Sequence, residues 1–391
     1  MDHIFPGVGG SIFFWHVDHI FLDDRTLSEL KNNGNRSMSR KDGIGPLVKK
    51  AYYLLGRKGL RGVTLLTSAG IRLFRSNKKR KHFAAKSGFS IPTVLIVSVT
   101  MACNYNCLGC YSRGRPENEE LSTAELDNLF GEAEAMGMLA VVLTGGEPLM
   151  RDDLLQIISR HRNLLFIMIT NGSLMTAEKA ALIGRCTNLV VLISIEGSDR
   201  HTDERRGEGA HRAVIAAMKH LKNAGGFFGF AATNNVFNSA YLGSDLFIDD
   251  MIDRGCSAGL ITEYVPCGPG RRPDWVIGPE QRESFRQRIL HLRSSKPIVL
   301  VQLPQDEYGE KNICSGAGRA SLHINSQGGI EPCPFVSLSC DSIRRGGLMA
   351  ALKSPFLAAI RSQPHLLSRN LQACSLFEHY PEVKALASKK K

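Results

Sequence analysis

Three cysteines at short, regular spacing are the strongest chemical signal in this sequence. Cys103, Cys107 and Cys110 form a Cx3CxxC array directly after an apolar run at residues 92–100. Three thiolates can bind three irons of a [4Fe-4S] cluster and leave the fourth iron open. A structural zinc ion needs four closed ligands, and no fourth Cys or His stands at zinc-finger spacing. We therefore predict an iron-sulfur cluster with one open iron.

Short apolar runs that alternate with amphipathic stretches must position this array. Six such pairs follow residue 88, which is typical of βα units around a parallel sheet. The expected strands are residues 92–100, 139–144, 165–170, 189–195, 227–233 and 260–265. The expected helices are residues 122–136, 177–183, 211–223, 245–254 and 279–293, with one more that begins near residue 152.

Six βα units joined by right-handed crossovers favour an open barrel over a closed barrel of about eight units. We therefore predict an α/β protein with a partial (β/α)6 barrel, whose lateral mouth can admit a large substrate. Barrel enzymes carry their active sites at the carboxyl ends of the strands. The cysteine array follows the first strand and so lies at that edge.

The character of the sequence divides the chain into three parts. Residues 1–87 are expected to be an N-terminal extension with basic amphipathic helices, residues 88–297 the partial barrel, and residues 298–391 a small cysteine-bearing α+β appendage with a C-terminal tail. The extension has candidate helices at 46–55 and 63–74, and the appendage has candidate strands at 321–325 and 329–331 and a candidate helix at 348–361.

Composition excludes several classes of protein. The chain is 43% hydrophobic and 22% charged, and no apolar run approaches the roughly 18 to 20 residues that a membrane span needs. Ten cysteines among 391 residues are too sparse for a disulfide scaffold, so reduced thiols in a cytoplasmic protein are expected. The apolar residues near the start lack a preceding basic region, so a cleaved signal peptide is not expected.

The positive charge is confined to one segment. The chain has a formal net charge of +12, and between Lys49 and Lys86 there are twelve basic residues and no acidic ones. Charges of one sign repel one another, so an anionic counterpart is expected. Interleaved apolar residues such as Tyr52, Leu65 and Phe74 suit a helix that lies in a membrane surface. No base-reading motif accompanies the charge, so peripheral contact with an anionic membrane through residues 49–86 is favoured over nucleic acid.

A second motif follows the next expected strand. Gly145, Gly146, Glu147 and Pro148 form a GGEP segment, and Tyr111 follows the last cysteine of the array. With these residues the sequence resembles the radical S-adenosylmethionine (radical SAM) superfamily. The resemblance implies that GGEP meets the amino group of S-adenosylmethionine. The chemistry is consistent, because glycines allow close approach of the backbone and Glu147 offers an acceptor for an ammonium group.

Three weaker segments extend the resemblance over about residues 92–293. Asn171 ends the third expected strand, and Ser194 and Glu196 end the fourth, where the family uses polar residues near the ribose and methionyl groups. Residues 203–209 resemble the family's D-x-x-R-G-x-G stretch, with Arg206 at the position of the arginine that pairs with the methionyl carboxylate. Such a pair is a strong charge-assisted contact.

The appendage resembles the SPASM or twitch region that follows many radical SAM barrels. Cys314, Gly328 and Cys333 give the spacing C-x13-G-x4-C, and Cys340 and Cys374 can complete the ligands of an auxiliary cluster. The full SPASM pattern has more cysteines, so one auxiliary cluster is expected rather than two. Cys267 is a substitute ligand if Cys340 or Cys374 points away. A cluster-free appendage with buried thiols is the alternative, and buried inert thiols are expected for the remaining two cysteines, Cys186 and Cys256.

The resemblance implies an enzyme that reductively cleaves S-adenosylmethionine to a 5′-deoxyadenosyl radical, which abstracts hydrogen from a substrate. An electron donor such as ferredoxin or flavodoxin is implied as a partner. The substrate class stays open between a peptide or protein and a lipid or isoprenoid. Glu263 and Tyr264, at the end of the sixth expected strand, are candidate proton or hydrogen donors. The alternative function is an iron-sulfur electron carrier or scaffold, which would have no use for GGEP or Arg206.

Overall fold

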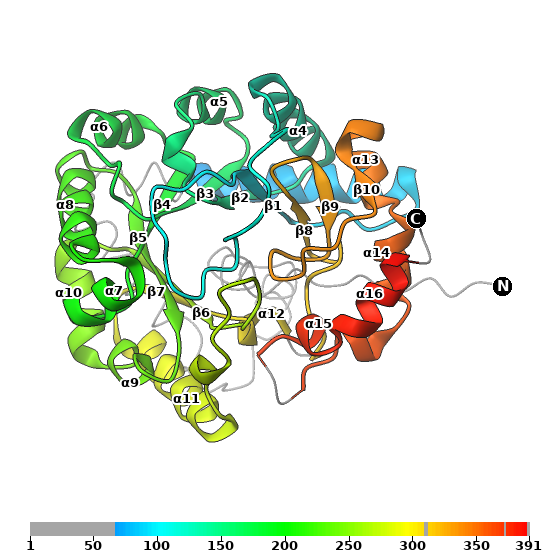
Figure 1. Ribbon diagram of the computed structural model, residues 1–391. Helices are drawn as coiled ribbons and strands as arrows, with labels where there is room; N and C mark the ends of the chain where they lie inside the picture. Colours follow the sequence, from blue (N-terminus) through cyan, green and yellow to red (C-terminus); the bar gives the residue numbers. More distant parts are fainter. Residues whose placement is uncertain (1–66, 309–311, 371–372, 389–391) are drawn as a thin grey trace, which may run out of the picture.

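A curved, mostly parallel sheet with helices on its outer side dominates the computed structural model, which describes residues 67–308, 312–370 and 373–388 (Figure 1). The strand order is β10-β9-β8-β1-β2-β3-β4-β5-β6-β7. The strands are β1 (Val94–Thr100), β2 (Ala140–Gly145), β3 (Leu165–Thr170), β4 (Leu189–Ser194), β5 (Phe228–Asn234), β6 (Ala258–Glu263), β7 (Val299–Leu303), β8 (Ser321–Ile324), β9 (Gly329–Glu331) and β10 (Asp341–Ser342). The predicted partial barrel is confirmed.

The helices that connect these strands surround the sheet. They are α4 (Thr123–Met136), η1 (Pro148–Met150), α5 (Leu154–Arg160), α6 (Ala177–Arg185), α7 (Asp199–Arg206), α8 (Ala210–Asn223), α9 (Ser239–Leu242), α10 (Asp245–Arg254), η2 (Pro273–Trp275) and α11 (Pro279–Ser295). After β7 come α12 (Gln305–Tyr308), η3 (Ile343–Arg345), α13 (Gly347–Leu352), α14 (Pro355–Arg361), η4 (Pro364–Leu366), α15 (Ser375–Glu378) and α16 (Tyr380–Ser388).

Alternation along the strands separates two faces of the sheet. Outward side chains such as Phe166 and Phe230 belong to the large core that the sheet shares with the helices. The inward side chains of five neighbouring strands form a separate apolar cluster: Ile167, Leu192, Ala231, Leu260 and Val301. Polar residues such as Ser194 follow this cluster toward the carboxyl ends. An apolar layer therefore supports a polar edge where the cysteine loop lies.

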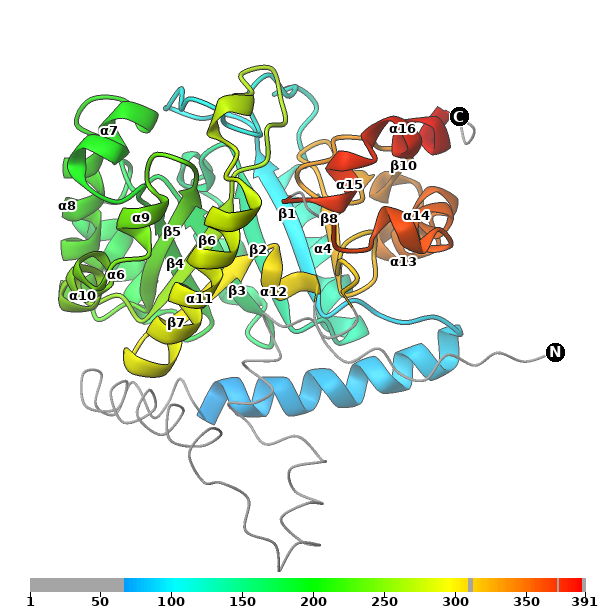
Figure 2. The ribbon, with the colours of Figure 1, turned by 90° about the horizontal axis from the view of Figure 1, so that it is seen from below.

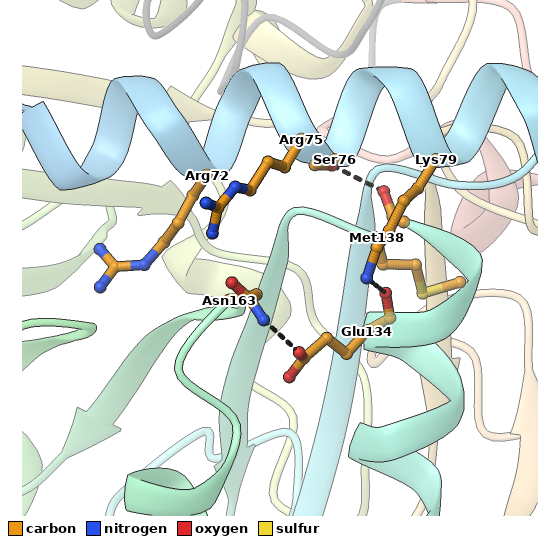
Figure 3. A pocket seen from close by; sticks show the side chains of 8 residues that line it. Arg72, Arg75, Ser76, Lys79, Glu134, Met138 and Asn163 are labelled. Carbon is orange, nitrogen blue, oxygen red and sulfur yellow. Dashed lines mark hydrogen bonds between the residues drawn. The ribbon is translucent and has the colours of Figure 1, made fainter.

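A helix at residues 67–87 closes the opposite, amino-terminal side of the barrel (Figure 2). Leu73 packs with Val94, Leu139 and Ala140 at the start of β1 and β2. Ser76 Oγ donates a hydrogen bond to the Gly137 carbonyl at 2.6 Å (Figure 3). Beside this contact a cavity of about 260 Å³ is lined by basic and polar side chains of both parts. One face of the basic segment is therefore seated on the barrel.

The appendage differs in part from the sequence-based expectation. Six barrel strands were expected, but β7 continues the parallel sheet beyond β6. On the other edge, β8 of the appendage pairs in parallel with β1, so the appendage extends the barrel sheet itself. The expected helix at 348–361 is split into α13 and α14, because Pro355 starts a new helix capped by Ser354.

Two other expectations about helices have clear outcomes. The expected capping box of α4 is confirmed, since Ser122 and Glu125 bond reciprocally at its start. The helix expected at 46–55 lies outside the described residues. In the described part of the chain, no helix is long and apolar enough to cross a membrane.

Candidate active site

The cysteine loop leaves β1 at the carboxyl edge of the sheet and is held by its neighbours. Leu108 N donates to the Arg205 carbonyl at 2.8 Å, which ties the loop to the end of α7. Asn104 accepts from Asn171 Nδ2 at 2.9 Å and donates to Ser173 Oγ at 2.8 Å. Contacts with the segments after β3 and β4 therefore position the loop, and Asn171 acts on it directly.

The three thiols of the array lie close enough to influence one another. Cys103 is exposed, Cys107 is buried and Cys110 is half-buried. Burial raises the pKa of Cys103, and the charges of Glu147, Cys107 and Cys110 raise it further. Burial also raises the pKa of Cys107, while the nearby cations Arg206 and Arg205 oppose that increase. Three neighbouring thiols of this kind fit an iron-sulfur cluster, whose irons bind them as thiolates.

The described residues contain no group of three Cys, His, Asp or Glu side chains close enough to hold a single metal ion. A cubane cluster does not require such convergence, because each thiolate binds a different iron. The array therefore fits a cluster better than a mononuclear metal site.

The glycine pair of GGEP is required by a close approach of two backbones. A Cβ atom on Gly145 would lie 2.2 Å from the Thr100 carbonyl oxygen, and one on Gly146 would lie 2.2 Å from that of Ala102. Gly145 also has a φ of 120°. The amides of Gly146 and Glu147 donate to the same two carbonyls at 2.8 Å. These glycines were predicted to let the backbone approach the cofactor. In the structure they let it approach Thr100 and Ala102, at the start of the cysteine loop.

Glu147 lies at the centre of this edge and is 1% exposed. Its Oε1 accepts from Thr170 Oγ1 at 2.6 Å and from Leu149 N at 3.0 Å, and its Oε2 accepts from Asn171 N at 2.7 Å. Burial raises its pKa, although these hydrogen bonds act in the opposite direction. A carboxylate has about four acceptor sites, so one remains for an ammonium group. Pro148 follows as the first residue of η1 and fixes the turn.

Two other predicted residues lie on the same edge. The Tyr111 hydroxyl is 2.6 Å from Thr144 Oγ1, and its ring makes an edge-to-face contact with Phe335 at 5.5 Å. Tyr111 thus connects the cysteine loop both to β2 and to the appendage. Ser194 is buried at the end of β4.

Glu196 binds two arginines, which the sequence analysis did not foresee. Arg206 donates to Glu196 Oε1 from Nε at 2.8 Å and from Nη2 at 2.5 Å. Arg205 Nη1 donates to the same oxygen at 2.5 Å, and Thr233 N donates to Oε2 at 2.9 Å. Arg206 was predicted to pair with a cofactor carboxylate, but here it is paired with Glu196. Two cations on one carboxylate leave a net positive charge beside Cys107.

Burial and charge act in opposite directions in this cluster. Burial alone would lower the pKa of Arg206, but the charges of Glu196 and Cys107 raise it. Burial alone would raise the pKa of Glu196, but Arg205 and Arg206 hold it below its usual value. Arg206 and Glu196 are therefore both charged at neutral pH. Arg205 is the residue that sequence reasoning missed here, although it directly precedes Arg206.

The family of the protein follows from the segment that carries this edge of the sheet. Residues 97–234 match the family model of the radical SAM superfamily. This segment of the chain therefore belongs to the radical SAM superfamily. Superfamily members use a [4Fe-4S] cluster and S-adenosylmethionine. The cysteine array and the acceptor site on Glu147 fit these two groups.

Similar proteins extend the relationship beyond that segment. The chain is 28% identical over 270 residues to mycofactocin maturase MftC of Mycolicibacterium smegmatis, an alignment that covers 63% of this chain and 66% of that protein. It is 28% identical over 262 residues to Fe-coproporphyrin III synthase of Methanosarcina barkeri, with 65% and 64% covered. The aligned region thus spans about two thirds of each relative.

A solved structure shows the same fold. The crystal structure of SuiB from Streptococcus suis bound to S-adenosylmethionine has a TM-score of 0.62 at 16% identity, over 73% of this chain and 71% of that one.

A second group of cysteines lies where the appendage meets the barrel. The cysteines are Cys267 after β6 together with Cys314, Cys333 and Cys374 of the appendage. A hydrogen bond with Cys374 and burial raise the pKa of Cys333, and the charge of Cys314 adds to this effect. Burial raises the pKa of Cys267 to about 12, and Cys374 contributes. None of the four thiols forms a disulfide, and Cys374 interacts electrostatically with each of the other three.

Cys340, a predicted ligand of the auxiliary cluster, is directed elsewhere. Its Sγ donates to the Ala387 carbonyl at 3.5 Å, on α16. The structure therefore favours Cys267 over Cys340 as the fourth member of the group.

The two candidate proton donors at the end of β6 have different surroundings. Glu263 is 2% exposed and accepts from Arg282 Nη2 at 2.6 Å and from Gln305 Nε2 at 2.6 Å. This buried ion pair belongs to the outer side of the barrel, so Glu263 is a structural residue and its predicted role is wrong. The Tyr264 hydroxyl lies 2.8 Å from the position of a Cβ on Gly109 and accepts from Arg272 N at 2.8 Å. Tyr264 therefore lies against the cysteine loop.

Proposed function

We propose that this protein is a radical SAM enzyme that modifies a peptide or protein. The observation that carries this proposal is the hydrogen bonding of the cysteine loop to Glu147 after β2 and to Arg205, which lies beside the Glu196–Arg206 pair after β4. When bound, the cluster and S-adenosylmethionine supply an electron and a 5′-deoxyadenosyl radical that abstracts hydrogen from the substrate. An iron-sulfur electron carrier would have no use for this arrangement of charged groups beside the cysteines.

The chain's own residues bind and orient the two groups. Cys103, Cys107 and Cys110 would hold three irons. Glu147 would accept a hydrogen bond from the methionyl ammonium at its remaining acceptor site. Arg205, Arg206 and Glu196 together keep a net positive charge beside Cys107. Arg206 would therefore attract the methionyl carboxylate. Asn104 and Asn171 fix the position of the loop relative to these charges.

A second cluster in the appendage is part of this proposal. Its ligands would be Cys267, Cys314, Cys333 and Cys374, which come from both sides of the interface between barrel and appendage. The convergence of four thiols from two parts of the chain supports a bound cluster, because iron-sulfur clusters are held by cysteine thiolates. The auxiliary cluster can exchange electrons with the first cluster, the substrate or a donor such as ferredoxin or flavodoxin.

The substrate class is supported by the relatives. The relative of Mycolicibacterium smegmatis is named a maturase, and SuiB has been crystallised with its precursor peptide SuiA. A peptide is therefore favoured over an isoprenoid or other lipid. β8 covers the β1 edge of the open barrel, so the carboxyl edge of the sheet is the place where a large substrate can reach the cysteine loop.

We also propose a peripheral contact with an anionic membrane. On the helix at residues 67–87, Ile71 and Phe74 are 52% and 72% exposed, although they are apolar. Exposed Lys78 and Lys81 lie on the same side of the helix as Phe74, within two turns of it. Apolar side chains flanked by basic ones suit the boundary between lipid headgroups and acyl chains.

Cleavage of S-adenosylmethionine tests the enzymatic proposal. Anaerobically reconstituted protein with dithionite should release 5′-deoxyadenosine, and Cys110→Ala should abolish the release. Cys186→Ala is the matched control, because Cys186 lies on the outer helical side and should leave the rate unchanged. Iron binding without any 5′-deoxyadenosine would support the electron carrier instead.

A further inference from the structure

Three loops, each of which carries a cysteine assigned above to a cluster, meet at one place. They are residues 110–115 after the array, residues 264–270 after β6, and residues 331–336 after β9. A Cβ on Gly268 would lie 3.3 Å from the Cys110 carbonyl oxygen, and one on Gly114 would lie 2.8 Å from Pro269 Cγ. The Tyr111–Phe335 ring contact joins the first loop to the third. The cysteines of the two groups are therefore connected through directly packed loops.

Arg115 is the charged residue at this junction. Its Nη1 donates to Glu331 Oε2 at 2.9 Å and its Nη2 donates to the Pro334 carbonyl at 2.6 Å. These two acceptors flank Cys333 in the sequence, and the Arg115 side chain is only 12% exposed. A planar guanidinium can hold two acceptors in a fixed relation. Arg115 thus fixes the loop of the array against the loop of Cys333.

The two charges of the Arg115–Glu331 pair face different surroundings. Arg115 acts on Cys267, since its positive charge opposes the burial that raises the pKa of that thiol. Glu331 faces the barrel interior, where its Oε2 lies 2.9 Å from His323 Nδ1 and its Oε1 accepts from Asn325 Nδ2 at 3.0 Å. His323 Nε2 in turn lies 3.0 Å from Ser98 Oγ. Burial lowers the pKa of His323, so no second cation offsets Glu331 on that side.

We propose that Arg115 is a positioning residue that sets both the placement and the reduction potential of the auxiliary cluster. This inference rests on the proposed function. A reduced cluster carries one more negative charge than an oxidised one. A buried cation beside Cys267 therefore stabilises the reduced state and raises the potential. If the ion pair were purely structural, removing its positive or its negative charge would not shift the reduction potential in opposite directions.

Opposite single substitutions separate the electrostatic role from a structural one. Arg115→Met removes the cation, and Glu331→Gln removes the anion while keeping the shape of the side chain. Both substitutions break the same ion pair. Arg115→Met should shift the auxiliary-cluster potential to more negative values and Glu331→Gln to more positive values. Each shift should be about tenfold in the equilibrium constant for reduction, or about 59 mV for one electron.

The potentials are measured on the reconstituted full chain by redox titration followed by electron paramagnetic resonance. Arg113→Met is the control, because Arg113 is an exposed arginine on the same loop and should leave the potential unchanged. If Arg115→Met fails to retain the second cluster, Arg115→Lys replaces it. Arg115→Lys keeps the positive charge but loses the paired N–H donors of the guanidinium. The potential of its auxiliary cluster should stay near that of the wild type.

Three results would overturn the inference. Shifts of the same sign in Arg115→Met and Glu331→Gln would leave only a structural ion pair. An unchanged potential in both variants, with iron for two clusters present, would remove the role of Arg115 but leave the proposed function standing. Iron for a single cluster in the wild type would remove the auxiliary cluster, and the inference with it.

Discussion

Arg206 donates two hydrogen bonds to Glu196, from Nε at 2.8 Å and from Nη2 at 2.5 Å, and the buried Glu196 and largely buried Arg206 lie beside Cys107. The pairing changes what a cofactor carboxylate would meet at this place. The carboxylate would meet a cluster of two arginines and one glutamate, whose net charge is positive. The attraction of the carboxylate therefore depends on the summed charge of Arg205, Arg206 and Glu196 and not on Arg206 alone.

Substitutions at this pair should separate binding from stability. Arg206→Ala leaves Glu196 paired with Arg205 and removes the net positive charge, so the affinity for S-adenosylmethionine should fall. The loss of one charge-assisted contact corresponds to about 1.5 to 3 kcal/mol, or about ten- to a hundredfold in affinity. Equilibrium binding to the reconstituted protein measures this loss, and iron content should stay unchanged.

Glu196→Gln should act on stability first. This substitution leaves two buried guanidinium groups without their carboxylate, which costs on the order of 3 to 5 kcal/mol in the free energy of unfolding. Thermal unfolding of the variant measures the cost. An Arg206→Ala variant that binds S-adenosylmethionine as the wild type does would mean that the pair is structural only.

Glu147 should make cofactor binding depend on pH. Burial raises its pKa, so the carboxylate that receives the ammonium group is lost by protonation at a higher pH than for an ordinary glutamate, whose pKa is about 4.3. Affinity for S-adenosylmethionine should therefore be full above the raised pKa and should fall as the pH drops through it. Glu147→Gln should bind more weakly at neutral pH and should lack this pH dependence.

A control distinguishes charge from local structure at Glu147. Thr170→Val removes one hydrogen bond to Glu147 Oε1 but leaves the carboxylate in place. It should keep most of the affinity and should keep the pH dependence. Equal pH profiles for the wild type and Glu147→Gln, measured by equilibrium binding between about pH 5 and 8, would assign Glu147 only the role of linking β2 to β3.

Local sequence patterns predicted most of the barrel. The runs that became β3 and α10 were expected at the bounds that the structure shows, Leu165–Thr170 and Asp245–Arg254, because each has one clear period and clear ends. β7 was missed although Val299–Leu303 is an apolar run, because the barrel was expected to end at residue 297 and the appendage to begin at residue 298. The parallel pairing of β8 with β1 joins segments more than 200 residues apart, and no local pattern reports such a contact.

The candidate site, like the barrel, was predicted only in part from local sequence patterns. The residue types and spacing of the array and of GGEP identified the loops that meet at the carboxyl edge. Partners set by tertiary packing were not visible in the sequence, as with Glu196 for Arg206, Arg282 for Glu263 and the choice between Cys267 and Cys340. The period of β6 would have placed Glu263 on the outer side of the sheet, opposite Tyr264, because neighbouring residues of a strand face opposite ways.

Iron content should separate Cys267 from Cys340. The wild type, reconstituted without oxygen, should bind about eight irons, four in each of two clusters. Cys267→Ala should lose irons of the second cluster, because Cys267 belongs to the group with Cys374. Cys340→Ala, which removes the contact with Ala387, should keep about eight. Loss of the second cluster in Cys340→Ala but not in Cys267→Ala would restore the ligand set expected from the sequence.

The membrane contact can be tested without disturbing the barrel. Leu73, Arg72 and Ser76 seat the helix at residues 67–87 on the barrel, so removal of the helix would expose the amino-terminal side. Substitution of its exposed residues avoids this problem. Phe74→Ser should weaken binding to vesicles that contain anionic lipid, because a buried aromatic side chain contributes about 1.5 to 3 kcal/mol.

Charge reversal on the same face completes the test. A Lys78→Glu, Lys81→Glu double variant should lose binding at low salt, since each basic residue near an anionic surface contributes about 1 kcal/mol. The difference from the wild type should shrink as salt screens the charges. Leu182→Ser is the matched control, because Leu182 is an exposed apolar residue on α6, 51% exposed, and should not affect sedimentation with vesicles. All of these variants should still cleave S-adenosylmethionine, since the cysteine loop lies at the opposite edge of the sheet. If the Phe74 and lysine variants sediment as the wild type does, the exposed face of this helix serves another purpose, and the membrane proposal is wrong.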